Sequence, residues 1–140
     1  MDFNTVLLSV GDKLPKDRVS ALMLKDKFER LSEDKQKEVA TQLPLLNLKS
    51  PALVFWVGTF LLGSLGVGRF MIGDIVLGLV RLGLTIVGII CDVLAFEYKF
   101  LGIVGGCVYL TNWIWWIVDM FLVGKKLRRQ NCEKIANLMN

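Results

Sequence analysis

Three apolar segments follow one another in the second half of the chain and set its predicted architecture. They run over about residues 51–67, 75–96 and 101–123. An uncharged helix over residues 51–67, at 1.5 Å per residue, covers most of the ~30 Å thickness of a bilayer's hydrocarbon core. The second segment is longer and contains Arg81, and the third ends just before a basic cluster at residues 125–129. The pattern predicts three apolar helices, of which at least two span a membrane.

The first 49 residues have a different pattern, in which apolar positions recur at helical spacing among charged ones. Leu24, Phe28 and Leu31 fall on one face of a predicted helix that begins near Lys16. Ser32 is placed to cap a second helix with acidic residues in its first turn. Two short amphipathic helices bury little surface alone. We expect them to fold on each other, on a partner or on the membrane surface, and the pattern favours a solvated helical pair.

Small and polar residues line up along one face of each apolar segment. Lipid provides no hydrophobic drive for helix association, so faces with small residues are typical of helix packing. The residues that we expect to pack are Thr59, Gly63 and Gly66 in the first segment, Gly78 and Gly88 in the second, and Gly102 and Gly105 in the third.

Four polar residues share these faces and form the predicted intramembrane polar network: Arg81, Asp92, Asn112 and Asp119. An arginine at membrane depth costs at least about 2.5 kcal/mol, which favours a paired or water-lined position. In one interpretation Arg81 pairs with Asp119 or Asp92, and the pairs fix packing and register. In the other, the faces line a polar pathway, which requires an oligomer because two or three spans do not enclose a pore.

Charge sets the expected topology. The net charge of +4 is carried by the two ends of the chain, and the positive-inside rule favours both ends in the cytoplasm. The first and third segments then span, and the middle one is re-entrant or lies against them; a three-span arrangement remains open. The turn around Arg69 is expected to face away from the cytoplasm. Trp113, Trp115 and Trp116 are expected in an interfacial aromatic belt, with ligand stacking as the alternative.

Composition adds few candidates for chemistry. The chain is 54% hydrophobic and has no histidine, no Cys-x-x-Cys and no phosphate-binding or nucleophile-elbow motif. We therefore expect no catalytic site, no metal site and no cofactor, and an enzyme is not expected. A basic tail beside a span is more typical of lipid contact than of nucleic acid binding. Cys132 lies in this tail, where a cysteine is a weak candidate for palmitoylation.

One motif resembles a known family. A glycine-rich run over residues 63–68 leads to a turn containing Arg69, Phe70, Gly73 and Asp74, and Trp115-Trp116-Ile117-Val118-Asp119 and Asn131 follow. This order resembles the two-transmembrane-segment (TM-two) domain family, in particular its small bacterial members. The resemblance implies two spans joined by a short turn and implies no established reaction. The chain departs from the family at Gly68, where members carry an acid or histidine, and in a longer interval between Arg69 and Asp119.

The sequence thus predicts an all-α integral membrane protein. Two spans form a helical hairpin with a third apolar helix, re-entrant or spanning, preceded by short amphipathic helices. We expect a charged cytoplasmic region over residues 1–49, a membrane domain over 50–124 and a basic cytoplasmic tail over 125–140. The expected role is a non-catalytic adaptor or assembly module in a bacterial inner membrane. Its partners would be the lipid bilayer, an unknown protein and a second copy of itself; the alternative is an oligomeric ion channel or membrane-permeabilising protein.

Overall fold

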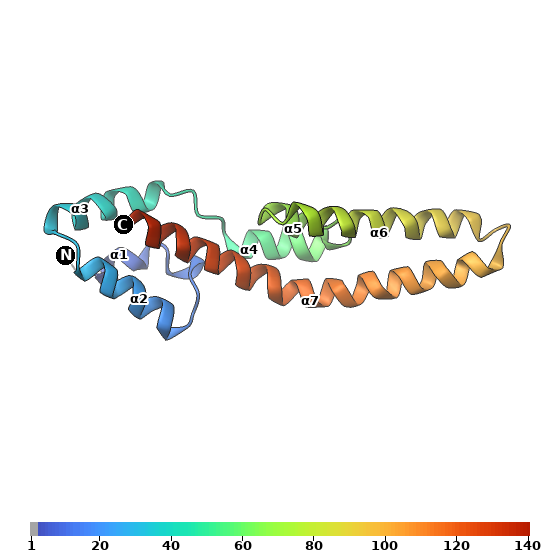
Figure 1. The fold of residues 1–140 in the computed structure, drawn as a ribbon, viewed down its shortest axis with the longest axis horizontal. Helices are drawn as coiled ribbons and strands as arrows, with labels where there is room; N and C mark the ends of the chain where they lie inside the picture. The colour runs from blue at the N-terminus through green and yellow to red at the C-terminus, as the bar shows by residue number, and fades with distance from the viewer. Residues whose placement is uncertain (1–2) are drawn as a thin grey trace. The chain divides into compact units, whose positions relative to one another are not determined.

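The chain is helical and divides into two compact units. The structure, a computed structural model, describes residues 3–140, and these residues form helices and no strand. One unit contains the residues up to Pro51 together with Lys125–Asn140, and the other contains Ala52–Gly124. Figure 1 labels the helices in chain order.

The first unit is a small helical domain with its own core. It contains α1 (Phe3–Leu8), α2 (Arg18–Glu29), α3 (Glu33–Gln42), two short 3-10 turns (Gly11–Lys13 and Leu43–Leu45) and the last part of α7 (Lys99–Leu138). Asp17 caps α2, because its carboxylate accepts a hydrogen bond from the Ser20 backbone N–H at 2.9 Å. The buried core comprises Phe3, Val6, Val10, Leu14, Leu24, Phe28, Val39, Leu43, Leu48, Cys132, Ile135, Ala136 and Met139.

Residues 125–140 complete this core instead of forming a separate tail. They continue α7, and Ile135 is fully buried. The Asn131 amide donates hydrogen bonds to the carbonyls of Lys13 and Lys49, each at 3.0 Å. Cys132 is buried, and desolvation raises the pKa of its thiol, so this cysteine is not presented for palmitoylation. The amphipathic faces of α2 and α3 are therefore covered within the chain.

The second unit contains the apolar segments. Its elements are α4 (Pro51–Leu53), a π-helix η3 (Val54–Leu61), a 3-10 turn η4 (Gly63–Leu65), α5 (Val67–Met71), α6 (Ile75–Leu94) and α7 as far as Gly124. Within the described residues, two helices are long and apolar enough to cross a membrane, α6 and α7. The prediction of one continuous helix over residues 51–67 was wrong, because the first apolar helix ends at Leu61.

Glycines explain why the first segment breaks. Gly66 has a φ of 73°, in the left-handed region that glycine adopts without strain, and it joins η4 to α5. The chain then turns back along itself. A Cβ built on Gly58 would lie 2.9 Å from the Gly68 Cα, so η3 and α5 approach closely only because both positions lack a side chain.

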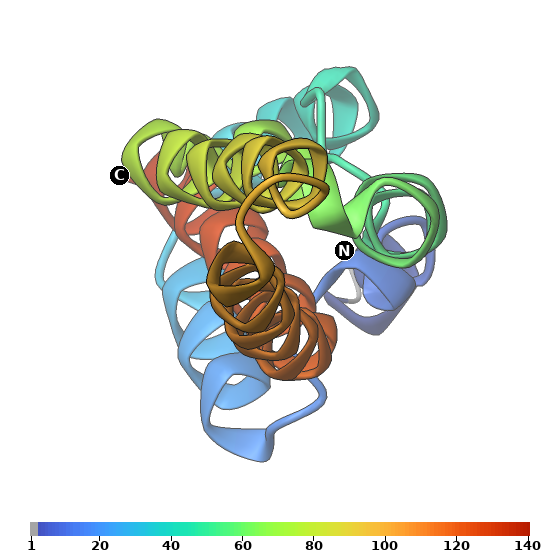
Figure 2. The same cartoon turned by 90° about the vertical axis from the view of Figure 1, so that its right-hand side faces the viewer.

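The helices α6 and α7 pair antiparallel in this unit, as Figures 1 and 2 show. The facing positions, from the 95–98 connection onward, are Ala95 with Gly102, Cys91 with Gly105, Gly88 with Tyr109, Thr85 with Asn112, and Arg81 with Asp119. The two predicted faces of small and polar residues therefore meet each other. The turn around Arg69 contacts Asp119, so it lies at the end of the pair opposite to the 95–98 connection.

Candidate functional site

Asp119 of α7 lies between two arginines in the interior of the second unit. Its Oδ1 accepts hydrogen bonds from Arg69 Nε at 3.1 Å and Arg69 Nη2 at 2.5 Å, and its Oδ2 accepts one from Arg81 Nη1 at 2.5 Å. Arg69 also pairs with Asp74 at 2.9 Å. The side chains of Arg81 and Asp119 are each about 1–2% exposed. We call Arg69, Asp74, Arg81 and Asp119 the charge cluster.

The charge cluster connects α5, α6 and α7. Its two guanidinium groups and two carboxylates balance in charge, which is the arrangement that buried ions require. Both oxygens of Asp119 already accept hydrogen bonds, so this carboxylate is occupied. Asp92, predicted to belong to the same network, lies apart: it is exposed and interacts with Tyr109.

A second hydrogen-bonded group lies next to the charge cluster. Asn112 Nδ2 donates to Thr85 Oγ1 at 2.9 Å, and Thr85 Oγ1 lies 2.6 Å from the carbonyl oxygen of Ser64, to which it donates. Arg81 Nη2 donates to the backbone carbonyl of Asn112 at 3.3 Å. The amide of Asn112 thus connects α7 to α6 and, through Thr85, to the η4 turn. The role of Ser64 depends on its backbone carbonyl, so no side-chain pattern in the sequence indicated it.

The three tryptophans predicted at the membrane interface have different positions. Trp116 packs inward, where its Nε1–H donates to the Thr59 carbonyl at 2.7 Å and its ring occupies the space in front of Gly63. Trp113 is 56% exposed, and Trp115 is half-buried. Backbone carbonyls at a helix end need a partner when water is absent, and Trp116 provides one.

The predicted packing residues are all used within the chain. Gly66 lies against the Gly78 backbone, and Gly78 lies under the Phe70 ring. The remaining contacts are Thr59 and Gly63 with Trp116, Gly88 with Tyr109, Gly102 with Ala95, and Gly105 with Cys91 and Asp92. The small-residue faces therefore pack η3, η4, α6 and α7 together and are not left open for a second copy.

Two glycines, one in the motif turn and one just before it, are required for different reasons. Gly73 has a φ of 83° and open space around it, so its conformation is what favours glycine. Gly68 is buried, and a Cβ there would lie 2.5 Å from Thr59 Oγ1 and 3.2 Å from the Gly58 backbone. A larger side chain at position 68 therefore has no room in this chain.

An aromatic groove lies between the first apolar segment and α7. Its volume is about 500 Å³, and its lining residues are Phe60, Leu61, Ser64, Tyr109, Asn112, Trp113 and Trp116. This volume falls within the range of roughly 300–1,000 Å³ that is usual for small-molecule sites. The sequence indicated the polar and aromatic residues of α7, but the contribution of Phe60 and Leu61 depends on the break in the first segment.

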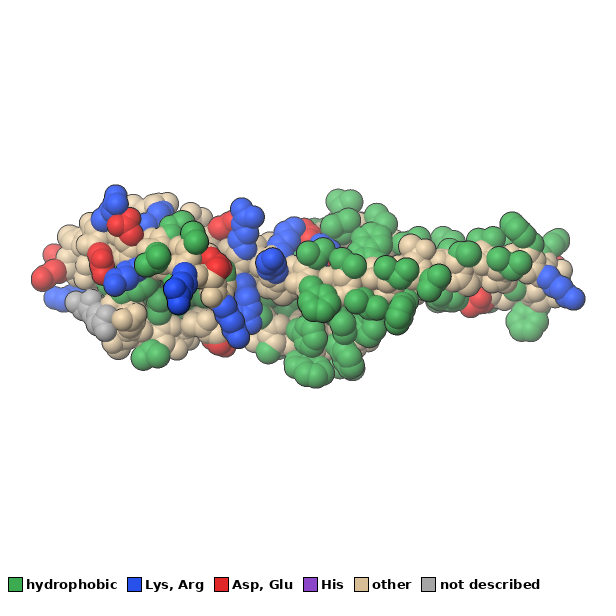
Figure 3. Space-filling model, turned by 90° about the horizontal axis from the view of Figure 1, so that it is seen from below, with side chains coloured by type: hydrophobic (Ala, Val, Ile, Leu, Met, Phe, Trp, Pro, Cys, Tyr) green, Lys and Arg blue, Asp and Glu red, His purple; other side chains and the backbone are tan. Residues whose placement is uncertain are grey.

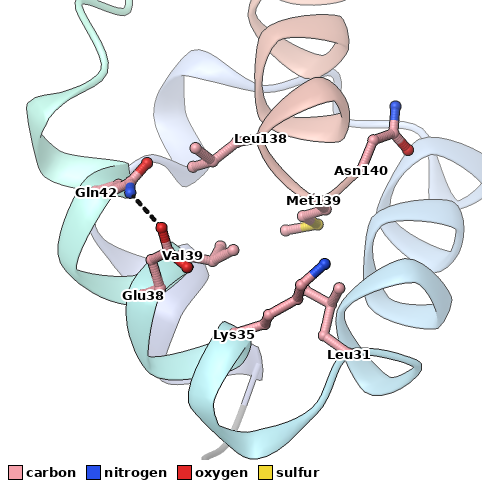
Figure 4. Close-up of a pocket in the computed structure, with 8 residues that line it drawn as sticks. All are labelled: Leu31, Lys35, Glu38, Val39, Gln42, Leu138, Met139 and Asn140. Carbon is pink, nitrogen blue, oxygen red and sulfur yellow. Dashed lines mark hydrogen bonds between the residues drawn. The ribbon is translucent and has the colours of Figure 1, made fainter.

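The first unit has a smaller pocket of about 200 Å³ between α3 and the end of α7. Figure 4 shows its lining, to which Leu31, Val39, Leu138 and Met139 contribute apolar side chains and Lys35 a long charged one. Gln42 and Glu38 are hydrogen-bonded to each other at 2.9 Å along one side. The pocket has the size of one or two amino-acid side chains.

No metal site is present among residues 3–140, because no three His, Cys, Asp or Glu side chains are grouped to hold an ion. No family model, no curated protein and no solved structure matches the chain.

Proposed function

We propose that the chain is a non-catalytic integral membrane protein, in which the second unit anchors a cytoplasmic first unit that binds a protein partner. The observation that supports this proposal most is the contrast between the two surfaces. Apolar side chains on α6 and α7 are exposed, among them Ile75, Val76, Leu79, Ile89, Val93, Ile103, Leu110 and Phe121. Figure 3 shows apolar side chains over the second unit and many charged ones over the first. The charges of the second unit's interior are paired with one another, as a bilayer requires.

In this proposal α6 and α7 form the two-span hairpin, and the first segment is re-entrant. The choice of spanning segments differs from the sequence-based expectation, in which the first and third segments span and the middle one is re-entrant or lies against them. At 1.5 Å per residue, Asp119 lies about 9 Å along α7 from Lys125, so the charge cluster sits near one headgroup layer and not at the bilayer centre. The positive-inside rule then favours a cytoplasmic location for the basic residues 125–129, and an external location for the 95–98 connection.

The occupied carboxylate favours an anchor over an ion channel. A pathway for ions needs polar groups that face the permeating ion. Asp119 instead accepts three hydrogen bonds from two arginines of its own chain. Because the glycine faces are also used internally, the oligomer that a channel requires lacks the interface that the sequence indicated.

We further propose that the chain is a divergent member of the TM-two domain family, on the basis of the order of the motif residues in the sequence. Arg69 of the motif turn and Asp119 of the tryptophan-rich stretch are 50 residues apart and form a buried ion pair. The two halves of the motif thus have one physical function, which is to hold α5 against α7.

Membrane location and topology can be tested on the full chain. Alkaline carbonate extraction should leave the protein in the membrane fraction. In intact cells an impermeant maleimide should label E97C, in the 95–98 connection, and should label K37C, on α3, only after permeabilisation. Release by carbonate would contradict the membrane proposal, and labelling of E97C only after permeabilisation would contradict the external location of the 95–98 connection.

Partner binding requires a gentler change than deletion of the N-terminal region. Removing the first 46 residues would expose the buried residues of α7, such as Ile135, so any loss of binding would be ambiguous. The substitution Gln42→Trp fills the pocket of the first unit, whereas Lys37→Glu alters the same helix away from it. We expect Gln42→Trp to reduce co-purification of the partner from solubilised membranes and Lys37→Glu to leave it unchanged. Equal recovery with both variants would argue against this pocket as the contact.

A further inference from the structure

Basic residues are concentrated where the chain enters and leaves the first unit. The chain passes from the first unit to the second after Pro51 and returns at Lys125. The proposed membrane location therefore places both of these points next to the bilayer. The basic residues within five positions of them are Lys49, Lys125, Lys126, Arg128 and Arg129.

Hydrogen bonds inside the first unit bring a third basic segment to the same end. The Asn131 amide donates to the backbone carbonyls of Lys13 and Lys49, each at 3.0 Å. Arg128 Nη1 donates to the backbone carbonyl of Leu14 at 2.9 Å. The start of the 13–18 segment is therefore fixed beside residues 49 and 128–131. The basic residues of the three segments, which we call the basic patch, are Lys13, Lys16, Arg18, Lys49, Lys125, Lys126, Arg128 and Arg129.

Acidic residues do not balance the basic patch. The patch contains eight of the 17 Lys and Arg residues of the chain, and Asp12 and Asp17 are the acidic residues within or next to its segments in sequence. Arg129 pairs with Glu133 at 3.2 Å, but both side chains are exposed, and such pairs contribute little. The rest of the first unit carries nearly equal numbers of positive and negative residues. Its positive charge is thus gathered at one end.

The exposed side chains of the basic patch suit an anionic membrane surface. Lys16, Arg18 and Lys125 are exposed and form no ion pair with any of residues 3–140. Clusters of about four to eight basic residues beside the cytoplasmic end of a span attract anionic headgroups. Val19 is 77% exposed next to Arg18, and an apolar side chain among basic ones fits the boundary between headgroups and acyl chains. Nucleic acid fits less well, because the three segments contain no aromatic residue on which a base could stack.

We propose that the basic patch binds the headgroups of anionic phospholipids in the leaflet next to the first unit. Lys16, Arg18 and Lys125 contact the lipid phosphates, and the start of α2 is held at the membrane surface. The second unit can span a bilayer without any such headgroup preference, so this inference goes beyond the anchor. It rests on the membrane location proposed above, which carbonate extraction tests separately.

The lipid selectivity of the full chain in detergent micelles tests the proposal. The probes are phosphatidylglycerol, which is anionic, and phosphatidylcholine, which has no net charge, with identical acyl chains and at equal concentrations. Native mass spectrometry compares the populations of protein that carry one lipid of each kind. We expect phosphatidylglycerol to be favoured roughly fivefold or more, which is the effect of one basic residue near an anionic surface.

Three variants locate the preference. Lys16→Glu combined with Arg18→Glu reverses two exposed charges and should abolish the preference; acidic residues suit the start of a helix, so α2 should be retained. Lys125→Gln changes a different segment of the patch and should by itself lower the preference several-fold, so the test does not depend on one variant. Lys35→Glu combined with Lys37→Glu makes the same change in net charge on α3 and should leave the preference unchanged.

Four results would overturn the proposal. Equal binding of the two lipids to the wild-type chain would show that no headgroup preference exists. A preference that survives both patch variants would place the anionic lipid elsewhere, and an equal loss in the α3 variant would show that net charge alone matters. Displacement of phosphatidylglycerol by a short single-stranded RNA at lower concentration would assign the patch to nucleic acid. Because selectivity is measured in micelles, each of these results is distinct from release of the protein by carbonate.

Discussion

Trp116 donates its indole N–H to the backbone carbonyl of Thr59 at 2.7 Å, and this bond joins α7 to the end of the first apolar segment. Thr59 lies in the π-helix that ends at Leu61, where regular helical hydrogen bonding stops. A tryptophan that the sequence places in an interfacial belt thus has an internal role. Trp116 donates a hydrogen bond to a carbonyl for which lipid offers no donor, and its ring covers Gly63.

We expect Trp116→Phe to destabilise the second unit by about 1–3 kcal/mol, because the carbonyl loses its donor while the ring is largely retained. Unfolding in mixed micelles, followed by circular dichroism, measures the effect. Trp113→Phe is the matched control, since Trp113 is exposed and should change stability by less than about 0.5 kcal/mol. Equal effects of the two changes would remove the special role of Trp116.

Removing one member of the charge cluster should be far more damaging than removing an exposed charge. Arg81→Met leaves Asp119 with only Arg69, and breaking a buried pair costs about 3–5 kcal/mol. Asp92→Asn, an exposed position on the same helix, should have little effect. Micelle unfolding compares the two. A double change of Arg81→Met with Asp119→Leu should lose less than the sum of the single changes, because these residues share one pair.

The lack of space at Gly68 provides a third prediction. Gly68→Glu should prevent correct packing of α5 on η3, since even a Cβ at this position meets Thr59 and the Gly58 backbone. Gly106→Ala lies on α7 with open space around its Cβ and should be neutral or stabilising by about 0.4–1 kcal/mol. Expression level and thermal stability in detergent give the readout. A well-folded Gly68→Glu protein would show that α5 packs differently from the structure described above.

The first unit should show a pH dependence that involves Asp17. Hydrogen bonds from the side chain and the backbone of Ser20 lower the pKa of this carboxyl in the folded state. A lowered folded-state pKa stabilises the protein above the unfolded value near 4, and this stabilisation is lost as pH falls through the folded-state pKa. Thermal melts of wild type and Asp17→Ala should therefore differ at pH 7 and converge toward pH 3. Asp12→Asn, which removes a carboxylate that does not cap α2, should not show this convergence.

Local chemistry in the sequence determined the helical class and much of the packing. The apolar segments indicated long helices, and α6 and α7 meet that expectation because apolar length alone decides it. The spacing of Gly78, Gly88, Gly102 and Gly105 identified faces that do pack on protein, because helical periodicity is a property of neighbours in sequence.

Tertiary structure decided which partners meet across long sequence intervals. The uncharged run over residues 51–67 was predicted as one helix, because its break depends not only on Gly66 but also on Gly58 meeting Gly68 and on Trp116 pairing with Thr59. The choice of Asp119 over Asp92 as the partner of Arg81 likewise follows from the register of α6 against α7. Residues 125–140 looked like a basic tail, yet their apolar positions complete the core of the first unit. Composition and periodicity report which face of a helix is apolar, whereas the partner of that face is set by how the whole chain packs.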